Sequence, residues 1–314
     1  MGSTQDIPST SHLDGFCYFF GHPLTHSLSP LLHQTVYDNI NLKWSQIPLD
    51  STDTELFLRL IQDPKCVGST VTMPHKVNII QHLNELTEEC RDIGACNTIF
   101  FKEKDGKRLL VGTNTDHIGI REAFFQNLPK GANSDIYRGR PGMVIGGGGA
   151  CRSAVYALHR WVGCNQIYIV NRDVSEVQAV IESCKKAGFG DSLIHVKTVA
   201  EAEALEAAGA IVSCIPNFPP KTPEEIEARA VIEVFLEKKE KGAILEMCYH
   251  PTPFTEIGIA SEKLGWQVIL GTEAMIYQGL EQDRHWTGKP IADLPSKQVH
   301  AAIAAALAAH GKSH

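Results

Sequence analysis

The sequence predicts an α/β protein of two domains, and three observations lead to this prediction. An apolar run at Met143–Ile145 leads into four glycines and then into a helical pattern, as in the first strand, turn and helix of a doubly wound Rossmann-type domain. Short apolar runs alternate with helical patterns along most of the chain. The 314 residues suffice for two separate cores. We expect a disordered tail at 1–15, an N-terminal α/β domain at 16–118 plus 286–314, and the doubly wound domain at 119–285.

Composition excludes several classes of protein. The net charge is −7 and no basic block is present, which argues against a nucleic-acid partner. Nine cysteines without a C-x-x-C pair indicate reduced thiols, with neither a disulfide framework nor a metal site. No apolar run reaches membrane-spanning length, and Met1–Gly15 lacks a signal-peptide core. We therefore expect a cytoplasmic protein without a membrane partner.

The first domain is expected to begin with a strand and a helix. Phe16–Phe20 is a short apolar run, and Pro30 suits the first turn of a helix that Ser29 would cap. Residues 32, 36 and 40 form one apolar face of that helix. Two interpretations of Ser27 and Ser29 stay open, namely helix capping and binding of a carboxylate near a helix N-terminus.

The next segment carries the first candidate for chemistry. After a strand at Trp44–Pro48 and a helix at Glu55–Ile61, the run Val67–Met73 reads as a strand. Pro74, His75 and Lys76 then begin a predicted helix that continues over Val77–Ile93. A lysine in a first helical turn faces the positive end of the helix dipole, which lowers its proton affinity. Lys76 is therefore a candidate, whereas His75 is expected at the surface or behind the site.

A hairpin and a second candidate follow. Gly94–Phe101 and Arg108–Gly112 are expected to pair around a polar turn. Asp116 then either caps the helix His117–Leu128 or serves a ligand site. Lys76 and Asp116 both stand where a strand gives way to a helix, the position from which α/β sheets present polar groups to ligands.

The glycine loop has the features of a dinucleotide site. Glycines at 146, 148 and 149 allow a tight turn and a close approach of pyrophosphate to the backbone. The next strand, Gln166–Val170, ends at Asn171–Asp173, about twenty residues from the loop, where the group that binds the adenosine ribose is found in such folds. Asp173 is expected to bind the cofactor, with capping of the next helix as the alternative.

The remaining elements continue the doubly wound pattern. Cys214 and Pro216 follow a strand at Ala210–Ser213, Thr222–Glu225 reads as a capping box, and Gly271 begins a helix that returns to the cleft. Glu273 and Met275 are expected to cap and pack. The other expected elements are strands at 193–196 and 243–247, helices at 199–207 and 222–236, and an alanine-rich helix from Pro295 that packs on the first domain through Val299, Ile303 and Leu307.

Taken together, these motifs resemble the shikimate/quinate dehydrogenase family nearly from end to end. The matching patterns are S-x-S-P at Ser27–Pro30, V-T-x-P-x-K at Val71–Lys76, G-A-x-N-T at Gly94–Thr98, N-T-D at Asn114–Asp116, G-x-G-G-A-x-R at Gly146–Arg152 and the late Gly271 with Gln278.

The resemblance implies an activity and a set of site residues. Members of the family oxidise a ring hydroxyl of a cyclic polyhydroxy acid and pass hydride to a nicotinamide. The resemblance implies that Lys76 transfers the proton and that Asp116 orients the Lys76 ammonium. It also implies that Ser27 and Ser29 hold the substrate carboxylate. It further implies that Thr72, Asn97 and Gln278 bind hydroxyls while Tyr249 closes the pocket. The implied cofactor residues are Gly146, Gly147, Gly148, Gly149, Ala150, Asn171, Arg172, Asp173, Cys214, Pro216 and Gly271.

Three departures from the family pattern bear on specificity. Thr70 stands where relatives often have asparagine, which alters the hydroxyl pattern that is accepted. Asp173 and Glu176 replace a threonine and a basic residue of NADP-specific members, and two carboxylates disfavour a 2′-phosphate. We therefore predict an NAD-dependent catabolic enzyme for quinate and shikimate, a monomer or homodimer whose partner is the small-molecule substrate. Because Arg172 can bind a 2′-phosphate, an NADP-dependent biosynthetic shikimate dehydrogenase stays open as the alternative. Outside this class of enzyme, the rival hypotheses are a catalytically silent sensing protein and a Rossmann-type methyltransferase.

Overall fold

The computed structural model describes residues 8–24, 27–250 and 252–310. The first half of the expected tail, residues 1–7, lies outside the described residues. The prediction is wrong for the end of the tail, because Leu13 is buried and Gly15 already belongs to a strand. The Lys65 ammonium donates to the backbone carbonyls of Ser11 and Leu13 at 3.3 and 2.8 Å, which fixes this segment to the sheet.

The chain forms two compact units. Unit 1 comprises Met1–Cys90, Cys96–Thr115 and Gly279–His314, and unit 2 comprises Arg91–Ala95 and Asp116–Gln278. These borders precede the expected ones at 118 and 285, and the sequence did not predict that Arg91–Ala95 belongs to unit 2. The helix α10 (Gly271–Thr287) therefore contributes its first turns to unit 2 and the rest to unit 1.

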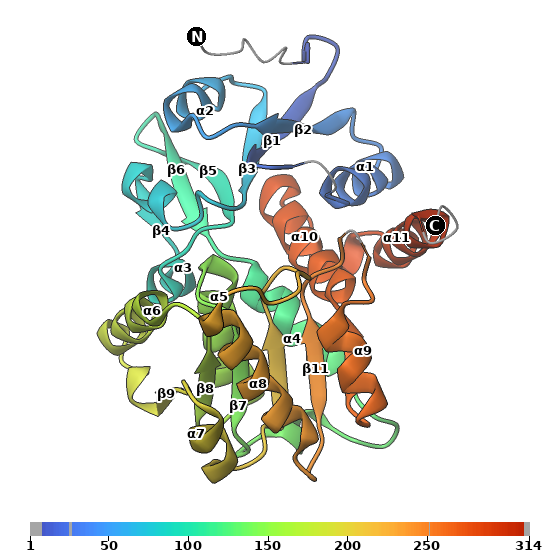
Figure 1. Cartoon of the computed structure of the whole chain (residues 1–314). Helices are drawn as coiled ribbons and strands as arrows, with labels where there is room; N and C mark the ends of the chain where they lie inside the picture. The colour runs from blue at the N-terminus through green and yellow to red at the C-terminus, as the bar shows by residue number, and fades with distance from the viewer. Residues whose placement is uncertain (1–7, 25–26, 251, 311–314) are drawn as a thin grey trace. The chain divides into compact units, whose positions relative to one another are not determined.

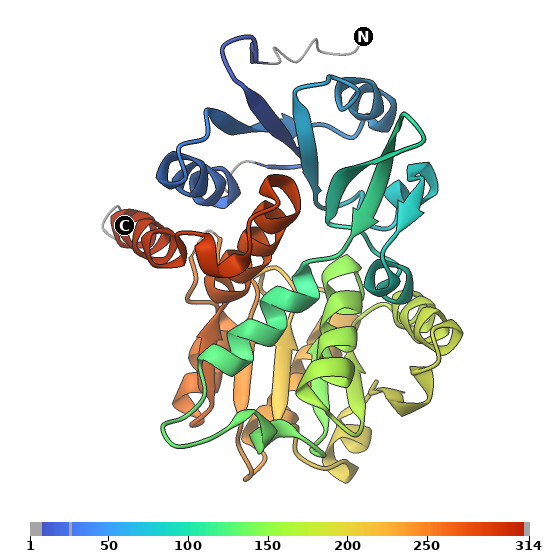
Figure 2. The ribbon, with the colours of Figure 1, turned by 180° about the vertical axis from the view of Figure 1, so that it is seen from behind.

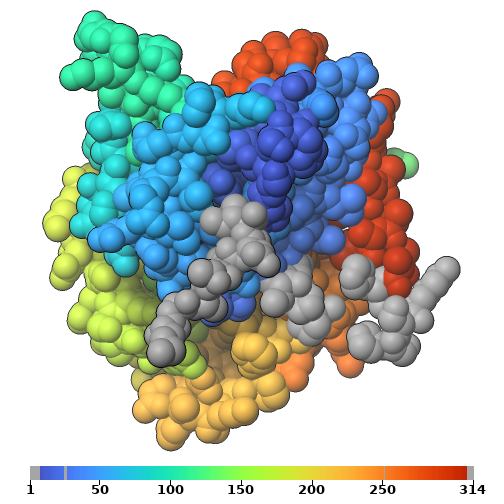
Figure 3. All heavy atoms as spheres, turned by 90° about the horizontal axis from the view of Figure 1, so that it is seen from above, coloured from blue at the N-terminus to red at the C-terminus, as the bar shows by residue number. Residues whose placement is uncertain are grey.

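Unit 1 is built on a mixed six-stranded sheet in the order β2-β1-β3-β5-β6-β4 (Figure 1). Strands β1, β2 and β3 are parallel, and β5 runs antiparallel to both β3 and β6. The expected hairpin is confirmed as β5 and β6, with Asp105 and Gly106 at positive φ in its turn. Its blue-green tip stands out at one edge of the face shown in Figure 3. The strands are β1 (Gly15–Gly21), β2 (Trp44–Asp50), β3 (Cys66–Val71), β4 (Glu85–Leu86), β5 (Thr98–Lys104) and β6 (Lys107–Thr113).

Side chains alternate between the two faces of this sheet. Phe16, Tyr18 and Phe20 of β1 enter an apolar core that includes Phe57 of α2 (Thr54–Leu60). On the opposite face, Cys17 contacts the hydroxyl of Tyr37 from α1 (Ser29–Asn39) at 3.4 Å. Helix α11 (Ser296–His310) packs against α1, so the predicted return of the C-terminal helix to the first unit is confirmed.

The expected α-helix at Val77–Ile93 is wrong. The structure has a short 3-10 helix η1 (Asn78–His82), then β4, then α3 (Glu88–Ile93). The Leu83 and Asn84 region bends away from helical geometry because Asn84 exchanges hydrogen bonds with Leu110 of β6 through its backbone N–H and its Oδ1 at 2.9 and 2.8 Å. Pairing with the sheet thus interrupts a segment with helical composition. A further 3-10 turn, η5 (Ile291–Asp293), precedes α11.

Unit 2 is a doubly wound parallel sheet in the order β12-β11-β10-β7-β8-β9, as predicted for a Rossmann-type domain. Successive residues of β7 enter opposite cores: Val144 packs with α4 and α5, and Ile145 packs with α8. Figure 1 shows α8 and α9 over one face, and Figure 2 shows α4 and α5 over the other.

The strands of unit 2 are β7 (Gly142–Ile145), β8 (Ile167–Val170), β9 (Leu193–His195), β10 (Ala210–Ser213), β11 (Ala243–Glu246) and β12 (Gln267–Leu270). Its helices are α4 (Asp116–Gln126), η2 (Ser134–Tyr137), α5 (Gly149–Ala157), η3 (Leu158–Val162), α6 (Val174–Lys186), η4 (Gly190–Ser192), α7 (Val199–Ala204), α8 (Pro223–Glu237) and α9 (Glu256–Lys263). The capping box of α8 at Thr222 and Glu225 is confirmed, with Pro223 at the first helical position. No helix in the described ranges has the length and apolar character needed to cross a bilayer.

The second half of α10 is anchored in unit 1 by its side chains. Trp286 donates its indole N–H to the carbonyl of Ile99 in β5 at 3.0 Å. Asp283 accepts from His33 of α1 at 2.9 Å, and both side chains are fully buried. Burial raises the pKa of Asp283, and the neighbouring His33 opposes that rise. These contacts explain why the unit border falls inside α10.

Gly68→Ala tests this anchor. A Cβ at Gly68 would lie 2.1 Å from the indole Nε1 of Trp286 and 2.5 Å from the carbonyl oxygen of Ile99. We expect a loss of about 1–3 kcal/mol in the free energy of unfolding, as for other overpacked cores. Gly148→Ala is the control, because a Cβ there meets nothing within 4 Å and its φ is −82°. Urea unfolding of both variants decides, and equal stability would contradict the anchor.

Candidate functional site

Lys76 lies in a turn and not in a helix. Thr72 N–H donates to the carbonyl of Phe20 at 2.8 Å, and His75 N–H donates to the carbonyl of Thr72 at 2.9 Å. The first helical residue after Lys76 is Asn78 of η1, so Lys76 does not lie in a first helical turn and the predicted effect of a helix dipole on it is wrong. The Lys76 carbonyl accepts from Cys96 N–H at 2.7 Å, which holds Lys76 beside the segment that leads into β5. Its side chain is half-buried.

His75 is buried, so of its two expected positions the surface is wrong and the position behind the Lys76 turn fits the structure. Its ring stacks on Phe20 at 4.1 Å between centroids, and Phe20 stacks on Phe57 at 4.2 Å. Its Nε2 lies 3.1 Å from the carbonyl oxygen of Ser51. Because a carbonyl only accepts, Nε2 carries a proton in this contact. His75 therefore supports the Lys76 turn from inside the core.

Ser29 does not cap α1. The N-cap is Leu28, which has no side-chain capping bond, and Ser29 is the first helical residue. The Ser29 hydroxyl instead donates to Oε1 of Gln46 in β2 at 2.9 Å. Ser27 accepts from the backbone N–H of Ser29 at 3.2 Å. Both serines are half-buried, and neither is the N-cap residue of α1.

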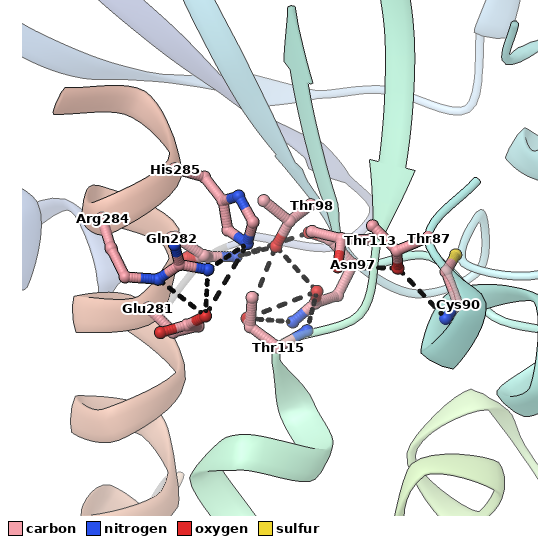
Figure 4. A network of polar contacts seen from close by, with 10 residues as sticks. All are labelled: Thr87, Cys90, Asn97, Thr98, Thr113, Thr115, Glu281, Gln282, Arg284 and His285. Atoms are coloured by element: carbon pink, nitrogen blue, oxygen red, sulfur yellow. Dashed lines mark hydrogen bonds and ion pairs between the residues drawn. The ribbon is translucent and has the colours of Figure 1, made fainter. Parts of the chain in front are cut away.

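A buried polar network surrounds Asn97 at the start of β5 (Figure 4). Thr115 N–H donates to Oδ1 of Asn97 at 2.7 Å, and Nδ2 of Asn97 donates to the Thr115 hydroxyl at 2.9 Å. Thr98 donates to the same Oδ1 at 2.7 Å. Gln282 of α10 donates from Nε2 to the Thr98 hydroxyl at 2.9 Å. These four residues are at most 2% exposed, so Asn97 is held rigidly by its partners.

The same network continues across the sheet to Ser29. Gln282 accepts from the Thr70 hydroxyl at 3.3 Å, and Thr70 accepts from Nε2 of Gln46 at 3.0 Å. Gln46 in turn accepts from Ser29. Hence Ser29 and Asn97, both predicted as site residues, are joined by a continuous series of hydrogen bonds within unit 1. Thr70, which stands where relatives often have asparagine, is buried and bonds to both Gln46 and Gln282.

Asp116, Tyr249 and Gln278 belong to unit 2. Asp116 is the first residue of α4 rather than the residue before the helix, and it is 3% exposed. Gln278 lies on α10 and Tyr249 follows β11, and both side chains are half-buried. Met275 is buried as expected for a packing residue, and Glu273 lies in the first turn of α10.

The glycine loop can accommodate an anion. Gly146 has a φ of +129°, which side chains rarely adopt, and a Cβ at Gly147 would lie 2.4 Å from Nδ2 of Asn171. Gly148 is the N-cap of α5 and supplies no side chain to its first turn. A Cβ at Gly148 meets nothing within 4 Å, so the space next to this helix N-terminus is open. Gly149 and Ala150 begin the helix, whose positive end favours a phosphate.

The segment after β8 is rich in carboxylates. Asp173 caps α6, as its Oδ1 accepts from Ser175 N–H at 2.8 Å, from the Ser175 hydroxyl at 2.6 Å and from Glu176 N–H at 3.2 Å. These bonds, led by that from the Ser175 hydroxyl, lower the pKa of Asp173. Glu176 accepts from Asn171 at 2.7 Å. Arg172 is paired with Glu225 of α8. The capping alternative is thus confirmed for Oδ1 of Asp173, and its role toward a cofactor stays a prediction.

Three further predicted residues line the same edge of the sheet in unit 2. Cys214 follows β10, and its Cβ would be 3.3 Å from a Cβ placed on Gly146. Pro216 is exposed and accepts from Phe218 N–H at 2.9 Å. A Cβ at Gly271 would lie 2.5 Å from the carbonyl oxygen of Met247, so only glycine fits where α10 begins. Among the residues that the structure describes, no group of three or more His, Cys, Asp or Glu side chains is placed to hold a metal ion.

Glu246 at the end of β11 is a buried carboxyl group that was not predicted from the sequence. This carboxyl group is 1% exposed and accepts from Cys248 N–H at 3.1 Å and from the Thr255 hydroxyl at 2.9 Å. Burial raises the pKa of Glu246 from 4.5 to about 7, against the lowering effect of these two bonds. A glutamate at the end of an otherwise apolar strand was the available signal.

Gln46 and Gln282 were also missed. Gln46 is the polar residue in the middle of a strand, and Gln282 follows Gln278 by four residues and so lies on the same side of α10. Each makes bonds to residues that are distant in the sequence. Spacing alone gave no reason to link them to Ser29 or Asn97.

The chain is similar to known proteins in both sequence and fold. A family model described as the shikimate dehydrogenase substrate binding domain matches residues 19–99. The chain is 48% identical to a quinate dehydrogenase of Emericella nidulans over 99% of both chains. A shikimate 5-dehydrogenase from Thermus thermophilus, solved in complex with NADP(H) and shikimate, is 25% identical with a TM-score of 0.70, over 92% of this chain and 98% of that one. A quinate dehydrogenase from Corynebacterium glutamicum in complex with NAD is 20% identical and shares the fold, with a TM-score of 0.75 over 93% of this chain and 99% of that one.

Glu246→Gln should change how stability depends on pH. Because the folded-state pKa is raised, the folded state holds a proton that the unfolded state releases between about pH 4.5 and 7, so Glu246 lowers stability progressively as pH rises through this window. The free energy of unfolding of the variant, relative to the parent, should therefore rise by roughly 3 kcal/mol from pH 4.5 to 8. Urea unfolding at four pH values measures this difference. Glu233→Gln, on the exposed side of α8, is the control, and parallel curves for Glu246→Gln and the parent would refute the assignment.

Proposed function

Because the chain belongs to the shikimate/quinate dehydrogenase family, we propose that it oxidises a ring hydroxyl of quinate, and also of shikimate, to the 3-dehydro ketone with NAD as the hydride acceptor. The observation that carries this proposal is the match to a quinate dehydrogenase over 99% of both chains. In this proposal, unit 1 contains most of the residues that bind the substrate, and unit 2 contains those that bind the cofactor.

The proposed cofactor-binding site is the loop between β7 and α5. The N–H groups at the start of α5 and the bare backbone of Gly146–Gly149 suit a pyrophosphate. Ala150 follows in the same turn. We assign Asn171, Arg172 and Asp173 to binding of the adenosine ribose, and Cys214, Pro216 and Gly271 to binding of the nicotinamide half. A nicotinamide bound at this loop would supply the hydride acceptor for the oxidation of the ring hydroxyl.

Lys76 and Asp116 are the residues that we assign to proton transfer. The hydroxyl proton has to leave as the carbon–hydrogen bond breaks, and Lys76 in its neutral form takes this proton at Nζ. Asp116 is the proposed second residue of this step, because the negative charge of a carboxylate stabilises an ammonium. His75 holds the turn of Lys76 in place through its contact with Ser51. In the reverse direction, Lys76 returns the proton to the carbonyl oxygen.

The remaining residues position the ring. Ser27 and Ser29 take the end of the substrate that carries the carboxylate, and Thr72, Asn97 and Gln278 bind ring hydroxyls. Tyr249 covers the ring. The pairing of Asn97 with Thr115 and Thr98 supports its part, because these bonds hold the amide in one orientation.

The preference for NAD rests on charge. Asp173 and Glu176 put two carboxylates beside the expected ribose position, where a free 2′-hydroxyl is favourable and a phosphate is not. Arg172 is the one residue that argues for NADP, and its guanidinium is engaged by Glu225. A phosphate would compete with that ion pair.

The first experiment is a two-by-two steady-state assay of quinate and shikimate, each with NAD and NADP. Turnover with NAD that exceeds turnover with NADP supports the proposal. Turnover of shikimate with NADP alone would favour the alternative, a biosynthetic shikimate dehydrogenase in which Arg172 governs the cofactor. Binding of either acid without turnover would indicate a silent sensing protein.

Lys76→Ala should lower kcat by roughly 10² to 10⁴ because proton transfer is lost, while the Kd of NAD stays nearly unchanged. Stopped-flow turnover and fluorescence titration of the cofactor measure the two quantities. Lys102→Ala, at an exposed lysine of β5, is the control for removal of a positive charge. A Lys76→Ala enzyme that keeps most of its rate would rule out Lys76 as the proton acceptor.

Asp173→Ser should raise the ratio of kcat/KM for NADP to that for NAD by roughly fivefold or more, because serine keeps the helix cap and removes the carboxylate. The same substitution at Asp53, which caps α2 through Leu56 N–H, is the matched control and should leave the ratio unchanged. An unchanged ratio in Asp173→Ser would mean that the carboxylate does not select the cofactor.

A further inference from the structure

The series of hydrogen bonds from Asn97 to Ser29 has a fixed direction, and two backbone groups set it. Thr115 N–H can only donate, so the Asn97 atom 2.7 Å away is its carbonyl oxygen. The backbone carbonyl of Asn97 can only accept, so the Gln282 atom 3.4 Å from it is the amide nitrogen. Backbone groups thus determine which way both side-chain amides point.

Each later bond in the series follows from the one before it. With its nitrogen toward Asn97 and Thr98, Gln282 turns its oxygen to Thr70, so the Thr70 hydroxyl donates at 3.3 Å. Thr70 has a single proton, so it must accept from Gln46, which therefore points its amide nitrogen to Thr70 at 3.0 Å. The oxygen of Gln46 is left for Ser29, and the Ser29 hydroxyl donates at 2.9 Å.

The two serines consequently differ in what they can offer a ligand. The proton of Ser29 is engaged by Gln46, so its oxygen presents lone pairs and can only accept. Ser27 accepts from Ser29 N–H at 3.2 Å, which leaves the Ser27 proton to a further acceptor. A carboxylate only accepts, so it suits Ser27 and meets lone pairs at Ser29.

We propose that Ser29 accepts a hydrogen bond from a substrate hydroxyl on the carbon that carries the carboxylate, while Ser27 donates to the carboxylate itself. A neighbouring donor and acceptor fit a carbon that bears both groups. Quinate has such a carbon, and shikimate lacks the hydroxyl. Ser29 is then a specificity residue, and Gln46, Thr70 and Gln282 are positioning residues that hold it as an acceptor. This inference rests on the proposed function and narrows its substrate.

The test compares binding of quinate with binding of dihydroshikimate, the same saturated ring acid without the hydroxyl at that carbon. Isothermal titration calorimetry with NADH present avoids turnover. We expect the parent to bind quinate more tightly. Ser29→Ala should lose roughly 3- to 10-fold for quinate and little for dihydroshikimate, the range for one hydrogen bond, whereas Ser27→Ala should weaken both acids alike. Equal losses for both acids in Ser29→Ala would overturn the inference.

The positioning residues have a separate readout. Gln282→Met removes the acceptor that fixes Thr70, so Gln46 can reverse and the preference for quinate should fall although Ser29 is present. Gln282→Glu in its protonated form keeps an oxygen toward Thr70 and should keep the preference. If Gln282→Met does not fold, Gln46→Met removes the acceptor of Ser29 directly and gives the same reading. An undiminished preference in these methionine variants would overturn the positioning role.

The outcomes for the parent protein separate this inference from the proposed function. Equal affinity for the two acids, together with NAD-dependent turnover of quinate, would overturn the inference and leave the proposed function standing. Failure to bind either acid would overturn both.

Discussion

The constraint on which unit 1 depends is that polar groups buried in its sheet must be paired. Seven polar side chains from Ser29 to Thr115 meet this requirement in one series of hydrogen bonds, and backbone groups of Asn97 and Thr115 lie at its fixed end. An unpaired member would cost about 1–3 kcal/mol, so each residue holds its neighbours in one orientation. Burial therefore does more than stabilise the fold, because it decides which atoms the half-buried Ser29 presents.

The second half of α10 connects this network to the core. Gln282, Asp283 and Trp286 lie within two turns and contact two different elements: β5 through the Thr98 hydroxyl and the backbone carbonyl of Ile99, and α1 through His33. Removing one partner of the buried His33–Asp283 pair would leave an uncompensated polar group. One helical segment thus fixes the sheet, the first helix and the polar series together. This explains why a segment that is distant in the sequence completes unit 1.

The sequence predicted features that depend on local chemistry and failed where distant partners decide. The strand Ala210–Ser213 and the capping box at Thr222 are encoded by neighbouring residues, and both are confirmed. The helix expected at Val77–Ile93 is interrupted because Asn84 bonds to Leu110 of β6. Ser29 appeared to be a cap, yet its partner Gln46 lies in the next strand. Motif positions could be predicted, but their hydrogen-bonding roles could not, because these depend on residues that the chain brings together only on folding.

Asp173 shows that a structural role and a ligand role need not exclude each other. Its Oδ1 accepts three bonds within the first turn of α6, and these bonds lower the pKa of the carboxyl group. Capping therefore keeps the group ionised, and a carboxylate has a second oxygen that can accept from a ribose hydroxyl. The same ionised group repels a phosphate, while Glu225 occupies the nearby Arg172. The cap that begins the helix thus also sets the charge that a cofactor meets.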